Sequence, residues 1–177
     1  MRIENLEFLA KGKRSSVYAG FLKKNKVAVK ISNRARIEGK WLRLLNREGI
    51  GPKLIKIEKD KLIYEFADGR RIGDCLKDKN IKPIIKKILK QCRSLDKLKI
   101  NKKELVNPYK HILVDKGKVV MIDFERCHKV NKGKNVTQFC EYLMRNKIVN
   151  RKRLTSLLKK YKSSQNDKNF KMILKRV

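Results

Sequence analysis

Hydrophobic positions along the chain predict a strand-rich first part and a helix-rich second part. Short apolar segments of strand length precede residue 67, and apolar residues at three- and four-residue steps dominate after it. The tripeptide Ala67-Asp68-Gly69 is a breaker at the point where this pattern changes. We therefore expect an α+β protein with two parts, residues 1–67 and residues 68–177.

Three strands and one helix are predicted in the first part. The strands are expected at residues 26–31, 54–57 and 62–66, the last two joined in a hairpin by a turn at 58–61. Residues 35–46 predict a helix because their apolar positions recur with the helical period. Its apolar stripe is expected to hold Ile37, Trp41, Leu44 and Leu45.

In the second part the clearest helix covers residues 81–98, with Pro83 in its first turn. Shorter helices are predicted at residues 136–144, 154–161 and 170–174. A strand is expected at residues 112–114, followed by a turn at Lys116-Gly117.

Residues 119–122 are four consecutive apolar positions that lead to Asp123. An uninterrupted apolar run of this length predicts a strand that is covered on both faces. A carboxylate at its end has two interpretations. Asp123 either caps the following turn through its side-chain oxygen, or it is a ligand for magnesium, which prefers carboxylate oxygens.

The charge is strongly unbalanced, with 49 Lys and Arg against 17 Asp and Glu and a formal net charge of +32. Such a surplus attracts polyanions, so RNA is a candidate partner. Lysine-rich surfaces also accompany solubility or heat adaptation. Ion-pair networks of heat-adapted proteins need acidic residues as well, and these are scarce here.

Two other classes of function are disfavoured by the sequence. The cysteines Cys75, Cys92, Cys127 and Cys140 have no CxxC spacing, so we expect buried thiols in a reducing compartment and no structural zinc site. The N-terminus has no apolar segment of signal-peptide length, and no run is long enough to span a membrane. We therefore expect a soluble, cytoplasmic protein.

Small residues at Ala10, Gly12 and Ser15, followed by Val17, have the spacing of a turn that covers phosphate groups. A plain surface hairpin with Gly12 in its turn is the alternative. Lys30 lies inside the predicted strand 26–31, where it either points outward at an exposed edge or lies under this turn and neutralises phosphate.

Glu38 is the only acidic residue in the predicted helix 35–46. We pair it with Lys30, because a lone carboxylate beside the apolar stripe can reach a partly buried lysine. A solvent-facing Glu that balances the basic residues of the helix is the alternative.

The order of these motifs resembles that of protein kinases over residues 6–145. A small-residue turn, the segment Val27-Ala28-Val29-Lys30, a helix with one Glu, an apolar hairpin, a long helix, a polar loop and Ile122-Asp123-Phe124 follow one another. The chain is similar to the RIO kinases, to the small kinase of the KEOPS complex and to predicted archaeal serine/threonine kinases. This resemblance implies a minimal two-lobed kinase-like fold, with an antiparallel sheet and one helix in the first lobe and a truncated, mainly helical second lobe.

The resemblance also implies a nucleotide site. Lys30, held by Glu38, would bind the α- and β-phosphates of ATP, and Asp123 would hold Mg²⁺. Tyr64 would be the gatekeeper beside the adenine. The remaining contacts to ATP would come from the turn, the strand and the backbone of the hinge, at Gly12, Ser15, Val17, Ala28, Glu65 and Ala67.

The catalytic loop departs from the kinase pattern. Alignment with the family places Lys102 at the position of its His and Glu104 at the position of its catalytic Asp, so Glu104 would act on the substrate hydroxyl. The second metal ligand would be Asn107 or His111. Glu125 follows Asp123-Phe124 where the family has Gly.

The implied function is an ATP- and Mg²⁺-dependent serine/threonine protein kinase of RIO-like type, possible also as an autokinase or ATPase, with a protein substrate of unknown identity. One alternative is a pseudokinase that binds ATP without transferring phosphate. Another is an RNA-associated assembly factor with a kinase-like fold, which would bind tRNA or ribosomal RNA through its basic surface.

Overall fold

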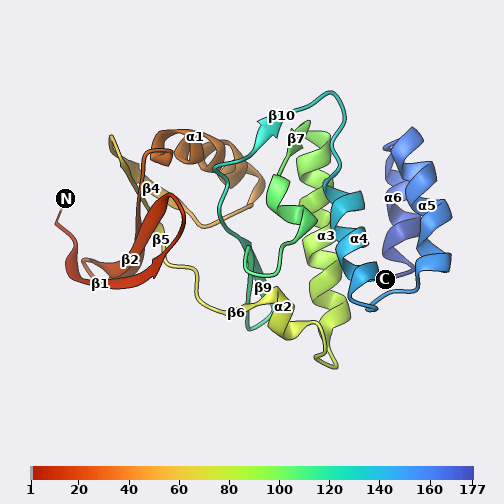
Figure 1. Cartoon of the computed structure of the whole chain (residues 1–177), viewed down its shortest axis with the longest axis horizontal. Coiled ribbons are helices and arrows are strands. Elements are labelled where there is room, and N and C mark those ends of the chain that lie inside the picture. The colour runs from red at the N-terminus through yellow and green to blue at the C-terminus, as the bar shows by residue number, and fades with distance from the viewer. Residues whose placement is uncertain (1) are drawn as a thin grey trace. The chain divides into compact units, whose positions relative to one another are not determined.

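The computed structural model describes residues 2–177 and divides the chain into two compact units (Figure 1). The first unit comprises residues up to Gly69 together with Val120–Arg126, and the second comprises Arg70–Val119 and Cys127–Val177. The sequence pattern placed the boundary after Ala67 and assigned Asp123 to the second part. Residues 120–126 group with the first unit because Asp123 and Phe124 bind side chains of that unit.

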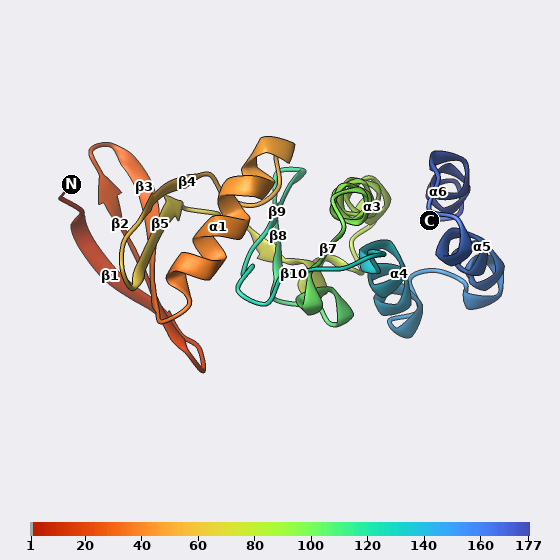
Figure 2. The same cartoon turned by 90° about the horizontal axis from the view of Figure 1, so that it is seen from above.

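The first unit is a five-stranded antiparallel sheet with the strand order β1-β2-β3-β5-β4. One α-helix, α1, lies on a face of this sheet (Figure 2). The elements are β1 (Glu4–Lys11), β2 (Ser15–Leu22), β3 (Asn25–Ser32), α1 (Ala35–Leu45), the 3₁₀ turn η1 (Asn46–Glu48), β4 (Leu54–Ile57) and β5 (Lys61–Glu65). The α+β prediction is confirmed, as is the hairpin of β4 and β5.

The predicted apolar stripe of α1 is only partly correct, because Leu45 alone among its four residues is fully buried. Ile37 is 47% exposed and Trp41 is only half-buried. The buried face holds Ala35, Glu38, Gly39, Leu42 and Leu45. Gly39 lets the helix approach the sheet closely, since a Cβ atom there would lie 2.6 Å from the side chain of Ile57. Small residues and a paired carboxylate share this face with two leucines, so apolar periodicity identified only part of it.

One further prediction about burial is wrong. Residues 119–122 were expected to be covered on both faces, but β9 ends at Met121 and only Met121 among these four residues is fully buried. All of β1 is exposed, including the large apolar side chains of Leu6, Phe8 and Leu9. An edge strand has one neighbour, so apolar composition alone does not bury it.

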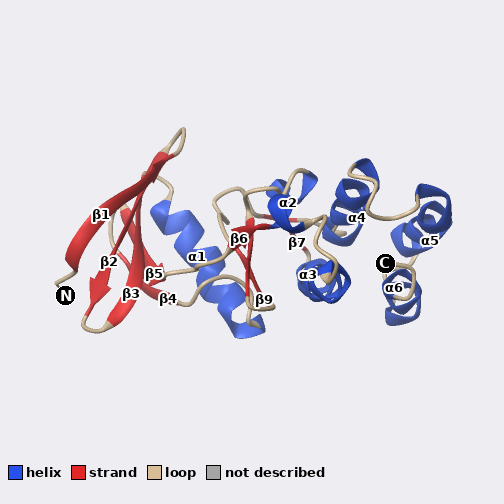
Figure 3. Ribbon diagram, turned by 90° about the horizontal axis from the view of Figure 1, so that it is seen from below, coloured by secondary structure: helices blue, strands red, loops and turns tan. Residues whose placement is uncertain are grey.

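The second unit is built mainly from helices (Figure 3). Its helices are α2 (Ile72–Cys75), α3 (Ile81–Lys97), α4 (Asn135–Arg145), α5 (Arg151–Ser163) and α6 (Asp167–Leu174), with the 3₁₀ turn η2 at Lys103–Val106. The four helices predicted in this part are confirmed as α3, α4, α5 and α6. Its short strands are β6 (Arg70–Arg71), β7 (Ile100–Asn101), β8 (Ile112–Asp115), β9 (Lys118–Met121, which crosses the unit boundary) and β10 (His128–Lys129).

A buried polar network fixes the start of α4 against the end of α3. Asp96 of α3 is 3% exposed and accepts hydrogen bonds from the backbone and side-chain amides of Asn135 at 2.8 and 2.7 Å, and from the Tyr161 hydroxyl at 2.9 Å. Asn135 also donates to the carbonyl of Ile100 and accepts from the backbone N–H of Lys102. Buried polar groups are tolerated when they are bonded in this way.

The four cysteines form no disulfide within the described residues, are buried, and all lie within the second unit. This agrees with their expected role as small apolar side chains. Among the described residues, no helix is both long and apolar enough to cross a lipid bilayer.

Candidate functional site around Lys30

Lys30 is the centre of the candidate site in the first unit. It lies on β3 between Val17 of β2 and Leu62 of β5, and it is 5% exposed. Its Nζ atom lies 2.7 Å from Oε2 of Glu38 and 3.0 Å from Oδ1 of Asp123. The structure thus brings Lys30, Glu38 and Asp123 together, and Lys30 does not point outward at a solvent-exposed edge.

Glu38 connects this cluster to the turn after β9. It lies on the buried face of α1, so its carboxylate points into the core and not toward solvent. One oxygen pairs with Lys30, and the other accepts a hydrogen bond from the backbone N–H of Phe124 at 3.1 Å. Glu38 therefore positions both the ammonium group and the backbone next to Asp123.

Asp123 has a left-handed backbone conformation, with φ of +66°. Asp tolerates this region better than most residues, and such strained conformations often occur at functional sites. Its side chain is 30% exposed, while the neighbouring Phe124 is 1% exposed. The turn therefore buries an aromatic anchor and leaves the adjacent carboxylate accessible.

Phe124 is seated against Gly51, which has φ of +82°. A Cβ atom at Gly51 would lie 2.9 Å from the Phe124 ring and 2.6 Å from Leu42. Gly51 thus combines a backbone conformation that favours glycine with a close approach to the anchor of the Asp123 turn.

Gly51→Ala is expected to lower the free energy of unfolding of the chain by about 2–4 kcal/mol, since it adds steric overlap to a left-handed conformation that costs about 1–3 kcal/mol. Gly49→Ala is the matched control: Gly49 has φ of +65° but nothing within 4 Å of an added Cβ. Urea denaturation followed by circular dichroism measures both. Equal losses would show that packing against Phe124 contributes nothing.

The electrostatics of the cluster favour a charged Lys30. Burial alone would lower the pKa of Lys30, but attraction to Glu38 and Asp123 outweighs it and raises the pKa above its ordinary value. Burial raises the pKa of Glu38, although Lys30 opposes this. Burial, and then the Glu38 carboxylate, raise the pKa of Tyr64, so its hydroxyl is neutral beside the cluster.

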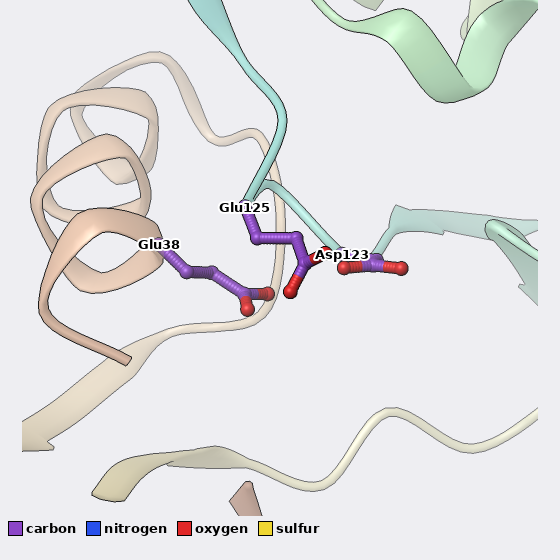
Figure 4. Close-up of side chains that lie close together, drawn as sticks. All are labelled: Glu38, Asp123 and Glu125. Carbon is purple, nitrogen blue, oxygen red and sulfur yellow. The ribbon is translucent and has the colours of Figure 1, made fainter. Parts of the chain in front are cut away.

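A third carboxylate, Glu125, completes an acidic group with Glu38 and Asp123 (Figure 4). One oxygen of each lies within 4.8 Å of the others. Hard carboxylate oxygens suit Mg²⁺, and the partly exposed Asp123 and Glu125 fit this ion. Glu38 is less suited, because its two oxygens already bind Lys30 and Phe124. Glu125 was not predicted as a ligand, and its position two residues after Asp123 is the one signal that could have found it.

The turn between β1 and β2 is a hairpin, as predicted. The Gly12 N–H donates to the carbonyl of Ser15 at 2.7 Å, which closes the turn. An open groove of about 480 Å³ adjoins it, lined by turn residues that include Lys13 and Arg14, and by the end of β3. The turn therefore presents small and basic residues next to a groove.

The strand residues predicted to contact adenine lie near one another on the sheet. Ala28 is opposite Ala19 of β2 and Tyr64 of β5, and Val17 is opposite Lys30. Ala67 follows the end of β5, and the backbone N–H of Glu65 is already used by the carbonyl of Lys53 at 2.9 Å. The backbone N–H of Glu65 is therefore not available for the predicted hinge contact.

Glu104, Asn107 and His111 belong to the second unit. Glu104 forms a buried ion pair with Lys102, with an oxygen-to-Nζ distance of 3.3 Å and side chains that are 3% and 0% exposed. Asn107 is exposed and ends η2, while His111 is half-buried before β8. The burial of Glu104 was not predicted, and it does not favour a base that must reach a substrate in solvent.

Comparison with protein-family models and with curated proteins gave no match for this chain.

Proposed function

We propose that the chain is an ATP- and Mg²⁺-dependent serine/threonine protein kinase of RIO-like type with a minimal two-lobed kinase-like fold. The observation that carries this proposal is the convergence of Lys30, Glu38 and Asp123 within direct ion-pair distance. In protein kinases a lysine on the third strand pairs with a glutamate of the next helix, and an aspartate of a later turn completes the site. The same three residue types come from β3, α1 and the turn after β9.

In this proposal each residue has one task. Lys30 binds the α- and β-phosphates of ATP as a point charge, and Glu38 holds its ammonium group in place. Asp123, with Glu125 beside it, would hold Mg²⁺, which when bound neutralises charge on the phosphates. Gly12, Ser15, Val17 and Ala28 surround the nucleotide, and Tyr64 limits the depth of the pocket.

A pseudokinase that binds ATP without transferring phosphate is the second candidate. It is favoured by one observation, the buried ion pair between Glu104 and Lys102. A carboxylate in such a pair is held by its partner and is poorly accessible to a substrate hydroxyl.

Two assays on the purified protein test both candidates. Calorimetric titration measures ATP binding, and incorporation of radiolabelled phosphate from ATP in the presence of Mg²⁺ measures autophosphorylation. Asp123→Asn is expected to lower phosphoryl transfer on the order of 100-fold or more, because it removes a preorganised charge from the reacting phosphates. Asp78→Asn, which changes an exposed carboxylate of the second unit, is expected to leave transfer unchanged.

Glu104→Gln tests the role of Glu104 in a protein that transfers phosphate. A loss of transfer with retained ATP binding identifies Glu104 as the acceptor of the hydroxyl proton. Transfer that is equal to that of the unchanged protein excludes Glu104 from this role. Binding of ATP without turnover, in Mg²⁺ or Mn²⁺, supports the pseudokinase, and absence of ATP binding would rule out both proposals.

A further inference from the structure

A cavity of about 540 Å³ lies within the second unit, whereas Lys30, Glu38 and Asp123 belong to the first. It is bordered by η2, by the loop that precedes α4, by α4 itself and by the end of α5. Its volume falls in the range of about 300–1,000 Å³ that is typical of ligand sites. The residues that determine its chemistry are Lys132, Lys134, Gln138, Glu141, Arg145 and Lys162.

Four of the ten lining residues are basic, namely Lys132, Lys134, Arg145 and Lys162, and one is acidic. Lys132 donates to the carbonyl of Ser163 at 2.9 Å, and Arg145 donates to the carbonyl of Val106. Within residues 2–177, the ammonium groups of Lys134 and Lys162 make no hydrogen bond or ion pair with the protein. Two unpartnered ammonium groups at one cavity provide a site for an anion.

The only carboxylate of the lining does not neutralise these charges. Glu141 forms its ion pair with Arg151, at 3.6 Å. After Glu125, the sequence has no acidic residue other than Glu141 and Asp167, and Asp167 pairs with Arg93 and Lys97. Basic side chains therefore outnumber acidic ones at the cavity four to one, which favours an anionic ligand.

Gln138 adds a specific hydrogen-bonding requirement. Its Oε1 atom is buried and has no hydrogen-bond partner within the described part of the chain. A buried acceptor without a donor costs free energy, so a ligand that supplies an N–H group is favoured here. A Gln side chain can form paired hydrogen bonds with the edge of adenine, where an amino group lies beside an acceptor nitrogen.

We propose that this cavity holds one phosphorylated nucleotide of a single-stranded RNA, with its base edge on Gln138 and its phosphates on Lys134 and Lys162. A phosphoserine peptide offers the same phosphate but no base edge for Gln138, so the nucleotide fits better. The net charge of +32 favours a nucleotide within an RNA chain over a free one, since neighbouring phosphates add binding energy by counterion release. The inference is independent of the ATP site.

Fluorescence anisotropy with a labelled single-stranded oligoadenylate tests the proposal on the full chain. Lys134→Ala/Lys162→Ala is compared with Lys168→Ala/Lys171→Ala, which removes the same charge from exposed positions of α6 outside the cavity. The cavity variant is expected to bind about tenfold more weakly at moderate salt. The slope of log affinity against log salt concentration should become about 1.4 less steep for the cavity variant. Each of the two lost phosphate contacts accounts for about 0.7 of this change.

Gln138→Leu is the second variant and changes no charge. It is expected to weaken oligoadenylate binding about tenfold, in line with a lost paired contact to adenine. Gln91→Leu is its control, because Gln91 of α3 also has a buried Oε1 without a partner but lies outside the cavity. Circular dichroism checks that each variant is folded. If the double lysine variant does not fold, Gln138→Leu alone still tests the proposal.

Two results would overturn the proposal. Equal losses for both lysine pairs, together with unchanged binding by Gln138→Leu, would mean that RNA binds only to general positive charge. Cavity-dependent binding of a phosphoserine peptide without RNA binding would identify a different ligand. Calorimetric titration of AMP into the unchanged protein and into Gln138→Leu distinguishes RNA from free nucleotide as the ligand. If AMP binds, Gln138→Leu weakens this binding and RNA does not bind, the site is assigned to a free nucleotide.

Discussion

Replacing Lys30 with Met is expected to lower the free energy of unfolding by about 3–5 kcal/mol, the usual cost of removing one partner from a buried ion pair. Methionine preserves most of the side-chain volume, so loss of charge dominates the effect. The Glu38 carboxylate, 3% exposed, would be left in the core without a counter-charge. The free-energy cost of leaving Asp123 without Lys30 is smaller, because the Asp123 side chain is 30% exposed and water can solvate its charge.

Urea denaturation followed by circular dichroism measures this effect. Lys53→Met is the matched control, since Lys53 pairs with Glu65 at 3.7 Å with a side chain that is 76% exposed, and its loss should cost less than about 1 kcal/mol. Lys30→Met/Glu38→Gln should recover a large part of the loss. The double variant removes the unpaired charge of Glu38 from the core and keeps a side-chain oxygen that accepts the hydrogen bond of the Phe124 N–H. No recovery would contradict the assigned role of the buried charge.

Asp96→Ala is expected to have the other large effect on stability, with a loss of about 3–5 kcal/mol. The variant leaves the N–H groups of Asn135 and Val136 and the Tyr161 hydroxyl without their buried acceptor. Each hydrogen bond to a charged group contributes about 1.5–3 kcal/mol, and contributions within one network do not simply add.

The same denaturation experiment tests Asp96→Ala. Asp78→Ala is the control: Asp78 pairs with Arg70 at the surface, where its side chain is 45% exposed, so its loss should change stability by less than about 1 kcal/mol. Asp96→Asn keeps one acceptor oxygen and should fall between the two. A loss below about 1 kcal/mol for Asp96→Ala would mean that water replaces the carboxylate at the start of α4.

The elements that sequence predicted well are those with strong periodicity. The apolar repeat of α3 and the short apolar segments of β4 and β5 gave correct elements with boundaries close to the observed ones. The pairing of Lys30 with Glu38 also followed from sequence, because a single acidic residue near a strand lysine left few alternatives.

Other features depended on contacts that no local pattern encodes. The buried side of α1 is formed by Gly39 and by Glu38 as well as by apolar residues. The predicted hydrophobic stripe therefore matched this side only at Leu45. The burial of Glu104 results from its pairing with Lys102, a fully buried lysine that composition would place at the surface. Gly51 and Asp96 gave no signal because their partners are distant in sequence.

The positions of the tryptophan and the cysteines have a practical consequence for measurements of unfolding. The single tryptophan, Trp41, lies on α1 in the first unit, whereas every thiol lies in the second unit. Burial raises the pKa of Cys140 to about 12 and also raises that of Cys92, so both thiols react slowly with alkylating reagents until the surrounding helices open. Intrinsic fluorescence and thiol-labelling rates therefore report on the two halves of the chain separately, without any introduced probe.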